Sequence, residues 1–174
     1  YAKAEGRTQP SALLTEDSHA GYQFYLHHFD GTSVVCNSAG SNSGIFSWLQ
    51  AHHDEKVFVV ADGAAFGSEM NRVMELQHQF PDKITLCLPE CFEWLILQSG
   101  LIDIPGLDAV LESPSESIDS QRYFSWENFF EEYLIQQTAG THYAYSKSQI
   151  HRFYTVRENS SRIVALIAAN LPKA

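Results

Sequence analysis

One stretch of the sequence decides the fold, and it reads Val57-Phe58-Val59-Val60-Ala61-Asp62-Gly63. Its first five residues are all apolar, with no alternation between apolar and polar side chains. A continuous run of this kind is typical of a strand covered on both faces, as in parallel sheets flanked by helices. The run ends at Asp62, and the glycine after it indicates a turn.

Three further apolar runs repeat this pattern, at residues 12–15, 33–36 and 84–88. Each of the four runs is followed by a segment of helical periodicity. These segments cover 18–29, about 45–53, about 70–76, and 89–100, where Pro89 and Gly100 suit the two ends of a helix. The repeated order of strand and helix predicts right-handed crossovers and a doubly wound, mainly parallel α/β sheet of Rossmann-like type, flanked by helices.

The chain divides into three parts. Residues 1–10 are polar and start without Met, so we expect a linker and a piece cut from a longer protein. Residues 11–100 form the α/β core. Residues 101–174 form a loop and helical extension packed on the same domain: mostly loop over 103–120, a helix over 126–138 with Ser125 as N-cap, and a last helix over about 160–170.

The composition is acidic, since 11 Lys and Arg stand against 21 Asp and Glu, which gives a net charge of -10. A basic footprint for nucleic acid is absent, so contact with DNA or RNA would need metal ions or a basic partner. The three cysteines show neither a disulfide framework nor a CxxC zinc motif. Because the sequence lacks a signal peptide and a long apolar run, we expect a cytoplasmic protein without membrane contact.

Acidic residues follow three of the four predicted strands. They are Glu16 and Asp17 after the first, Asp62 after the third, and Glu90 and Glu93 after the fourth. Ligands of open α/β sheets bind beyond the carboxyl ends of the strands, and Mg²⁺ prefers oxygen ligands. The pattern therefore predicts a Mg²⁺ or Mn²⁺ site, although each acid alone could instead cap the helix that follows it.

The second strand leads into a loop of small polar residues. Its backbone N–H groups could bind a phosphate at Ser38, Gly40, Ser41, Asn42 and Ser43. The loop matches neither common phosphate-binding motif. A plain turn with Asn42 or Ser43 as helix N-cap explains it as well.

Three other features have simpler interpretations. Lys147 could stabilise negative charge in a reaction, but we interpret it as an ordinary surface lysine. The pair His52-His53 is expected to cap a helix end. The aromatic residues over 124–133 have helical spacing, which favours a core role over base stacking.

Several of these segments together resemble a known family. The stretch Glu16-Asp17-Ser18-His19-Ala20-Gly21 resembles the first motif of Toprim domains, and Val59-Val60-Ala61-Asp62-Gly63-Ala64 resembles their strand ending in Asp-x-Asp. The loop 38–45 and the segment 88–95 are similar to motifs of Toprim domains in OLD-type (overcoming lysogenization defect) ATPase–nucleases. The likeness covers about residues 13–97. Some bacterial ATPases loosely labelled "translation initiation factor 2" have a similar tail.

The resemblance implies metal-dependent phosphodiester chemistry on a nucleic acid or another phosphate-bearing ligand. Glu16 would be an acid/base or ligand, Asp62 a metal ligand, and Glu93 a further ligand, with Asp17 and Glu90 as substitutes. It also implies a P-loop ATPase domain as partner, since the chain itself has no P-loop. One departure weakens this expectation, because Ala64 replaces the second acid of Asp-x-Asp.

Three functions therefore stay open. The first is a Mg²⁺-dependent nuclease or phosphoryl-transfer domain, and the second is a non-catalytic Toprim-like regulatory or partner-binding module. The third is a nucleotide-binding regulator that uses the loop 38–44. A serine hydrolase is disfavoured because no GxSxG motif occurs.

Overall fold

The computed structural model describes residues 10–63, 67–118 and 122–169. The expected linker, except Pro10, and Ala64 lie outside the described residues.

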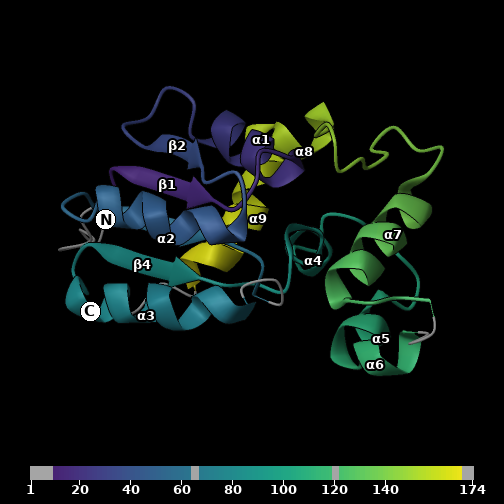
Figure 1. The fold of residues 1–174 in the computed structure, drawn as a ribbon. Coiled ribbons are helices and arrows are strands. Elements are labelled where there is room, and N and C mark those ends of the chain that lie inside the picture. The colour runs from purple at the N-terminus through teal and green to yellow at the C-terminus, as the bar shows by residue number, and fades with distance from the viewer. Residues whose placement is uncertain (1–9, 64–66, 119–121, 170–174) are drawn as a thin grey trace.

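Four parallel strands form one sheet, as the sequence predicts (Figure 1). They are β1 (Ala12–Thr15), β2 (Val35–Ser38), β3 (Val57–Val60) and β4 (Ile84–Cys87). The order across the sheet is β2-β1-β3-β4. Thr15 pairs with Ser38 on one side and Val60 on the other, so the carboxyl ends lie level. The chain runs from β1 to β2 and then returns past β1 to β3, which makes the β1–β3 boundary the topological switch point.

Helices cover both faces of this sheet. One face carries α2 (Asn42–Ala51) and α3 (Met70–Gln79), and the other carries α1 (Ala20–His28), α4 (Phe92–Gln98) and α9 (Arg157–Ala169). Alternate strand residues point to opposite faces, so Leu14 and Val59 join the first set of helices while Leu13 and Phe58 join the second. Both faces are therefore apolar, which explains the continuous runs.

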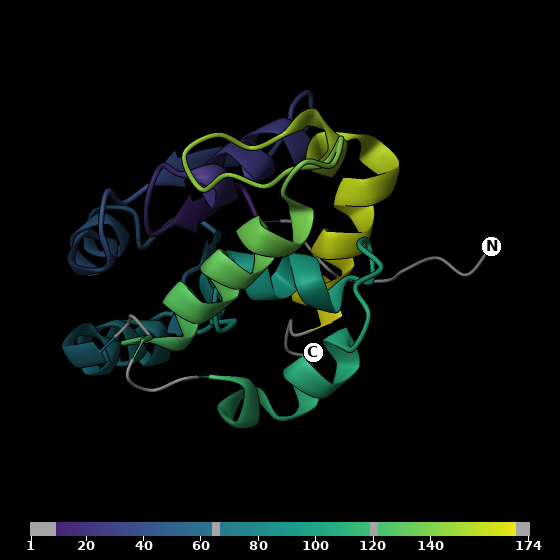
Figure 2. The same cartoon turned by 90° about the vertical axis from the view of Figure 1, so that its right-hand side faces the viewer.

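The C-terminal part joins the core on the α4 side. It contains α5 (Leu107–Glu112), α6 (Pro114–Ser117), α7 (Trp126–Thr138) and α8 (Arg152–Thr155). Helix α7 packs on α4, and its Phe130 and Leu134 are fully buried in the same cluster as the sheet residues. The loop from α7 to α8 passes over α1 (Figure 2), where the Ala20 N–H donates to the Lys147 carbonyl at 2.9 Å.

Several predicted boundaries are wrong, for local reasons. Strand β2 lies two residues later than expected. Helix α4 begins at Phe92 and not at Pro89, because the Cys91 Sγ atom accepts from the Trp94 N–H as N-cap. The expected loop over 103–120 contains α5 and α6, and α8 was not predicted. The N-cap of α7 is Ser125, as predicted. Phe124 is 96% exposed, so not every aromatic residue over 124–133 belongs to the core.

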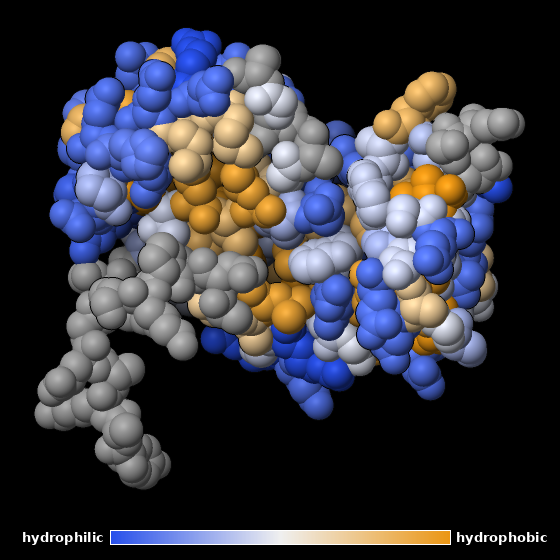
Figure 3. All heavy atoms as spheres, turned by 90° about the horizontal axis from the view of Figure 1, so that it is seen from below, coloured by the Kyte–Doolittle hydropathy of each residue, from blue (hydrophilic) through white to orange (hydrophobic). Residues whose placement is uncertain are grey.

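Strand β4 lies at one edge of the sheet and has no partner strand on its outer side among the residues described. Beside it lies a pocket lined mainly by apolar residues, namely Met74, Pro81, Ile84, Leu86 and Leu88, together with Gln77 and Thr85. Figure 3 views the molecule from below and shows apolar surface toward the middle of this side. Within the described segments, no helix has the length and apolar character needed to cross a membrane.

Candidate functional site

Three acidic side chains from three strand ends meet at one cavity beside the switch point. Glu16 follows β1, Asp62 follows β3, and Glu93 lies in the first turn of α4, after β4. All three line a cavity of about 40 Å³. This volume has room for about three water molecules. The cavity occupies the place where open α/β sheets bind their ligands.

Local hydrogen bonds hold the strand ends together. Buried Thr15 donates its hydroxyl to the Asp17 carbonyl at 2.9 Å, which turns the chain after β1. Burial raises the pKa of Glu16, and the nearby backbone N–H of Asp62 lowers it in part. The Gly63 N–H donates to the Pro89 carbonyl at 2.7 Å, and a Cβ atom on residue 63 would lie 3.0 Å from the carbonyl oxygen of Leu88. The segments after β1, β3 and β4 are thus joined around the cavity.

Glu93 is held by a tyrosine from the loop between α7 and α8. Its side chain is 3% exposed, and its Oε1 atom accepts a hydrogen bond from the Tyr145 hydroxyl at 2.5 Å. Burial raises the pKa of Glu93, while the bond from Tyr145 lowers it and only partly compensates. Tyr145 therefore fixes the orientation of a carboxyl group that burial tends to keep neutral.

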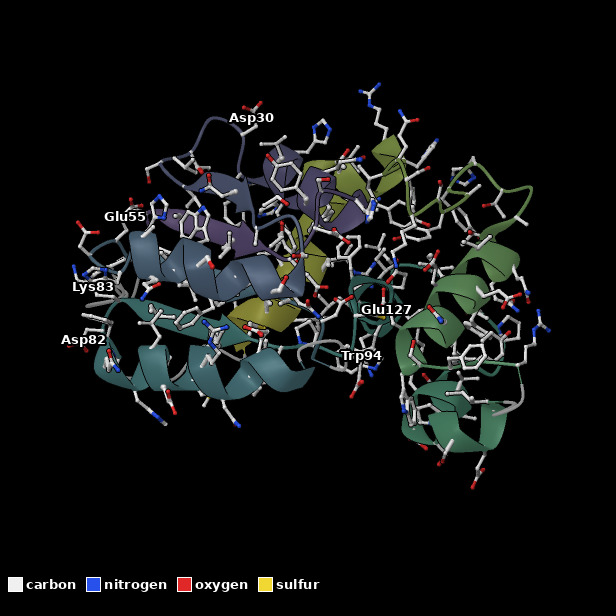
Figure 4. All side chains as sticks on the ribbon, in the orientation of Figure 1. Asp30, Glu55, Asp82, Lys83, Trp94 and Glu127 are labelled. Atoms are coloured by element: carbon white, nitrogen blue, oxygen red, sulfur yellow. The ribbon has the colours of Figure 1, made fainter. Side chains whose placement is uncertain are left out.

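Lys147 comes from the same loop and also lines the cavity. Its Nζ atom donates to Glu127 at 2.6 Å and to Glu131 at 3.0 Å, both on α7. Figure 4 shows Glu127 on the side of α7 nearest to the sheet. Burial lowers the pKa of Lys147, but the bonds to the two glutamates raise it above its ordinary value. The lysine is therefore charged and partly buried, and its interpretation as an ordinary surface residue is wrong.

Carboxyl groups outnumber lysine at the cavity, which Glu16, Asp17, Asp62, Glu93 and Lys147 line. Burial raises the pKa of Asp62 to about 8, and the neighbouring charges of Glu127, Glu93 and Glu16 reinforce the rise. Burial and the adjacent Asp17 raise the pKa of Glu16. Lys147 offsets both effects in part. At neutral pH the cavity therefore favours the uptake of a proton or of a cation.

The other predicted acids lie differently. Asp17 lines the cavity, but its carboxylate accepts from the His19 N–H at 3.0 Å and lies 2.8 Å from the His19 ring. Glu90 is exposed and is not among the residues that line the cavity. His52 lies at the end of α2, as predicted, with its ring nitrogen 2.8 Å from the Trp48 carbonyl.

The small polar loop after β2 does not line this cavity. Strand β2 lies on the outer side of β1, so its end is one strand away from the β1–β3 boundary. The Ser41 and Ser43 hydroxyls contact each other at 2.9 Å. The N-cap of α2 is Ser41, without a side-chain cap bond, and not Asn42 or Ser43 as expected. A phosphate at this loop would therefore lie apart from the acidic cavity.

Several residues of the site were not predicted from the sequence. Glu127 and Glu131 are four residues apart and therefore share one face of the predicted helix. This spacing could have indicated that the two carboxylates bind one cationic side chain. Tyr145 and Lys147 are two residues apart and both reach the cavity. Their distance from Glu16 along the chain gave no indication of this contact.

The residues present fit a partly hydrated cation better than a fully protein-ligated one. In the described part of the chain, no three His, Cys, Asp or Glu side chains are grouped so that they could hold a metal ion. Mg²⁺ is usually bound through one or two carboxylates and keeps several waters. Among the residues that the structure describes, the buried Glu16 Oε2 atom has no hydrogen-bond partner. Glu16 and Asp62 are the fitting pair, since Glu93 is engaged by Tyr145.

Comparisons with protein-family models, with curated proteins and with solved structures found no match to this chain. The resemblance to Toprim domains stays a prediction. Function is therefore inferred from the chemistry of the cavity.

Proposed function

We propose that this chain binds Mg²⁺ or Mn²⁺ between Glu16 and Asp62 and acts on phosphodiesters as a divergent Toprim-type domain of a larger ATPase. The proposal is carried by one observation, namely that these two carboxylates flank the switch point and share one cavity. Both side chains are partly buried and have raised pKa values, and carboxylates with raised pKa values are a common mark of functional sites. A cation would remove the repulsion between them.

Each residue of the cavity has a distinct role in this proposal. Glu16 and Asp62 would hold the cation, which supplies Lewis-acid polarisation of a phosphoryl oxygen. Glu16 has a raised pKa, which suits proton transfer nearer to neutral pH. Lys147 keeps its charge at the cavity and can stabilise negative charge on a phosphate. Tyr145 keeps Glu93 in a fixed orientation.

The acidic character of the chain limits how a nucleic acid could approach. With a net charge of -10, the chain repels polyanions. The proposed cation and Lys147 would attract one phosphate locally, and an associated P-loop ATPase domain would supply the remaining affinity.

A non-catalytic module is the second candidate. Ala64 stands where the related motif has its second acid. The Glu93 carboxylate is also engaged by Tyr145. Both observations favour a site that binds a cation for structural or regulatory reasons and does not cleave.

A metal titration tests cation binding, which both candidate functions require. For a dissociation constant of about 1 mM, about 10 mM Mg²⁺ raises the free energy of unfolding by about 1.4 kcal/mol, or the Tm by about 3–6 °C. Asp62→Ala should abolish this rise. Asp30→Asn, which removes an exposed carboxylate outside the cavity (Figure 4), should preserve it. The absence of any rise in the wild type would refute cation binding.

Plasmid nicking separates the two candidates. Nicking by the wild type with Mn²⁺ or Mg²⁺, lost in Asp62→Ala and retained in Asp30→Asn, supports the nuclease. A clear metal-induced rise in Tm without nicking supports the non-catalytic module.

A further inference from the structure

The loop between α7 and α8 is fastened to helix α1, over which it passes (Figure 2). The side-chain amide of Gln23 makes two hydrogen bonds to this loop. Its Nε2 atom donates to the Ser148 carbonyl and its Oε1 atom accepts from the Ile150 N–H, both at 3.0 Å. The Ala20 N–H adds a third bond of 2.9 Å, to the Lys147 carbonyl. One helix therefore holds this part of the loop at three successive points.

The fastened part of the loop carries a cationic side chain to the cavity. Lys147 lines the cavity, as does Tyr145 shortly before it. Helix α1 begins at Ala20, shortly after Glu16, which is one of the two proposed cation ligands. Gln23 thus ties the lysine of the site to the segment that follows a carboxylate of the site.

The Lys147 ammonium group keeps one donor for a ligand. An ammonium group carries three N–H donors, and Glu127 and Glu131 accept two of them. Among the residues that the structure describes, no further acceptor contacts the Nζ atom. Because a lysine stem is long and flexible, the place of the third donor depends on where the loop holds the backbone of Lys147.

We infer that Gln23 is a positioning residue, which clamps the loop so that the third donor of Lys147 meets a phosphate oxygen at the cavity. This inference rests on the proposed function. Gln23 is not among the residues that line the cavity, so it acts through Lys147 and not on the ligand. Fixing a loop before the ligand arrives strengthens binding, because less freedom of the chain is lost on association.

The test compares Gln23→Met and Lys147→Met, singly and together. Methionine is about as long as glutamine but makes neither of the two bonds, and Gln23 is only half-buried, so the fold should persist. The affinity for inorganic phosphate is measured at saturating Mg²⁺ by NMR titration, and the affinity for Mg²⁺ by calorimetry. We expect Gln23→Met to bind phosphate about fivefold to tenfold more weakly and to bind Mg²⁺ as the wild type does.

The double variant separates positioning from a structural role. In the Lys147→Met background, adding Gln23→Met should change phosphate affinity by less than about twofold, because the side chain that it positions is absent. A structural role alone would lower the Tm of Gln23→Met and leave the phosphate affinity of the folded protein unchanged. Should Gln23→Met not fold, Gln23→Glu, which keeps the acceptor for the Ile150 N–H, replaces it in the same comparison.

Gln136→Met is the matched control. The Gln136 side chain also donates one hydrogen bond, to Glu132 at 3.0 Å, but it is exposed on α7 and does not line the cavity. This variant should keep the affinities for phosphate and Mg²⁺ within about twofold of the wild type.

The outcomes distinguish the inference from the function on which it rests. If the wild type binds neither Mg²⁺ nor Mn²⁺, the proposed function fails and the inference fails with it. Binding of Mg²⁺ without phosphate leaves the cation site in place and overturns the inference. Equal phosphate affinity in Gln23→Met and the wild type overturns the inference alone, as does an equal loss from Gln23→Met with and without Lys147.

Discussion

Replacing Asp62 with asparagine should make the protein more stable at alkaline pH when no metal is present. Asp62 has a pKa of about 8 in the folded state against an ordinary value of 3.8, chiefly because of burial. Between these two values the folded state holds a proton that the unfolded state has released. The contribution of Asp62 to the free energy of unfolding is therefore fully present below about pH 4, decreases as the pH rises, and is constant again above about pH 8.

The size of this effect follows from the difference between the two pKa values. About four pH units at about 1.4 kcal/mol each give an upper limit of about 6 kcal/mol. Relaxation of the protein and entry of water reduce such penalties, so we expect a loss of about 2–3 kcal/mol from this group. Asparagine has nearly the same shape as aspartate and does not ionise, so the free energy of unfolding of Asp62→Asn does not decrease in this way as the pH rises.

Urea unfolding at pH 5, 7 and 9 in the presence of a chelator measures this difference. The stability of wild type relative to Asp62→Asn should fall by about 1.5–2 kcal/mol between pH 5 and 9, because about a quarter of the loss occurs below pH 5 and the titration of other groups largely cancels. Asp30→Asn is the matched control, since it makes the same chemical change at an exposed residue outside the cavity. A constant difference between wild type and Asp62→Asn at all three pH values would refute the account of Asp62 as a buried, proton-holding carboxylate.

Three further substitutions test other parts of the structure by urea unfolding at pH 7. Tyr145→Phe removes the bond to the Glu93 carboxylate and should cost about 1.5–3 kcal/mol; a cost below about 0.5 kcal/mol would show that Glu93 does not depend on it. Gly44→Ala would bring a Cβ atom to 2.2 Å from the Ala39 carbonyl oxygen and should cost about 1–3 kcal/mol, whereas unchanged stability would contradict the close approach. Ser125→Ala removes the N-cap of α7 and should cost about 1 kcal/mol without changing Mg²⁺ affinity.

The strand–helix order and the parallel sheet were predictable because they depend on local patterns. A strand covered on both faces needs apolar side chains at every position, and 57–60 reads that way. The helix Trp126–Thr138 was found because its spacing and its N-cap both belong to one short segment. Predicted helix boundaries were wrong where one side-chain hydrogen bond decides at which of several neighbouring residues the helix begins, as the Cys91 side chain does for α4.

The sequence by itself determined that acidic residues follow the strands. Because parallel strands end at one edge of a sheet, it also predicted that Glu16, Asp62 and Glu93 lie close together. Only the tertiary structure decided which strands are neighbours, and therefore that the loop 38–43 lies outside the cavity. It alone brought Tyr145 to Glu93, 52 residues away, and Lys147 to the same cavity. The physical reason is that periodicity reports which face of an element is buried, whereas partners distant in sequence depend on how whole elements pack.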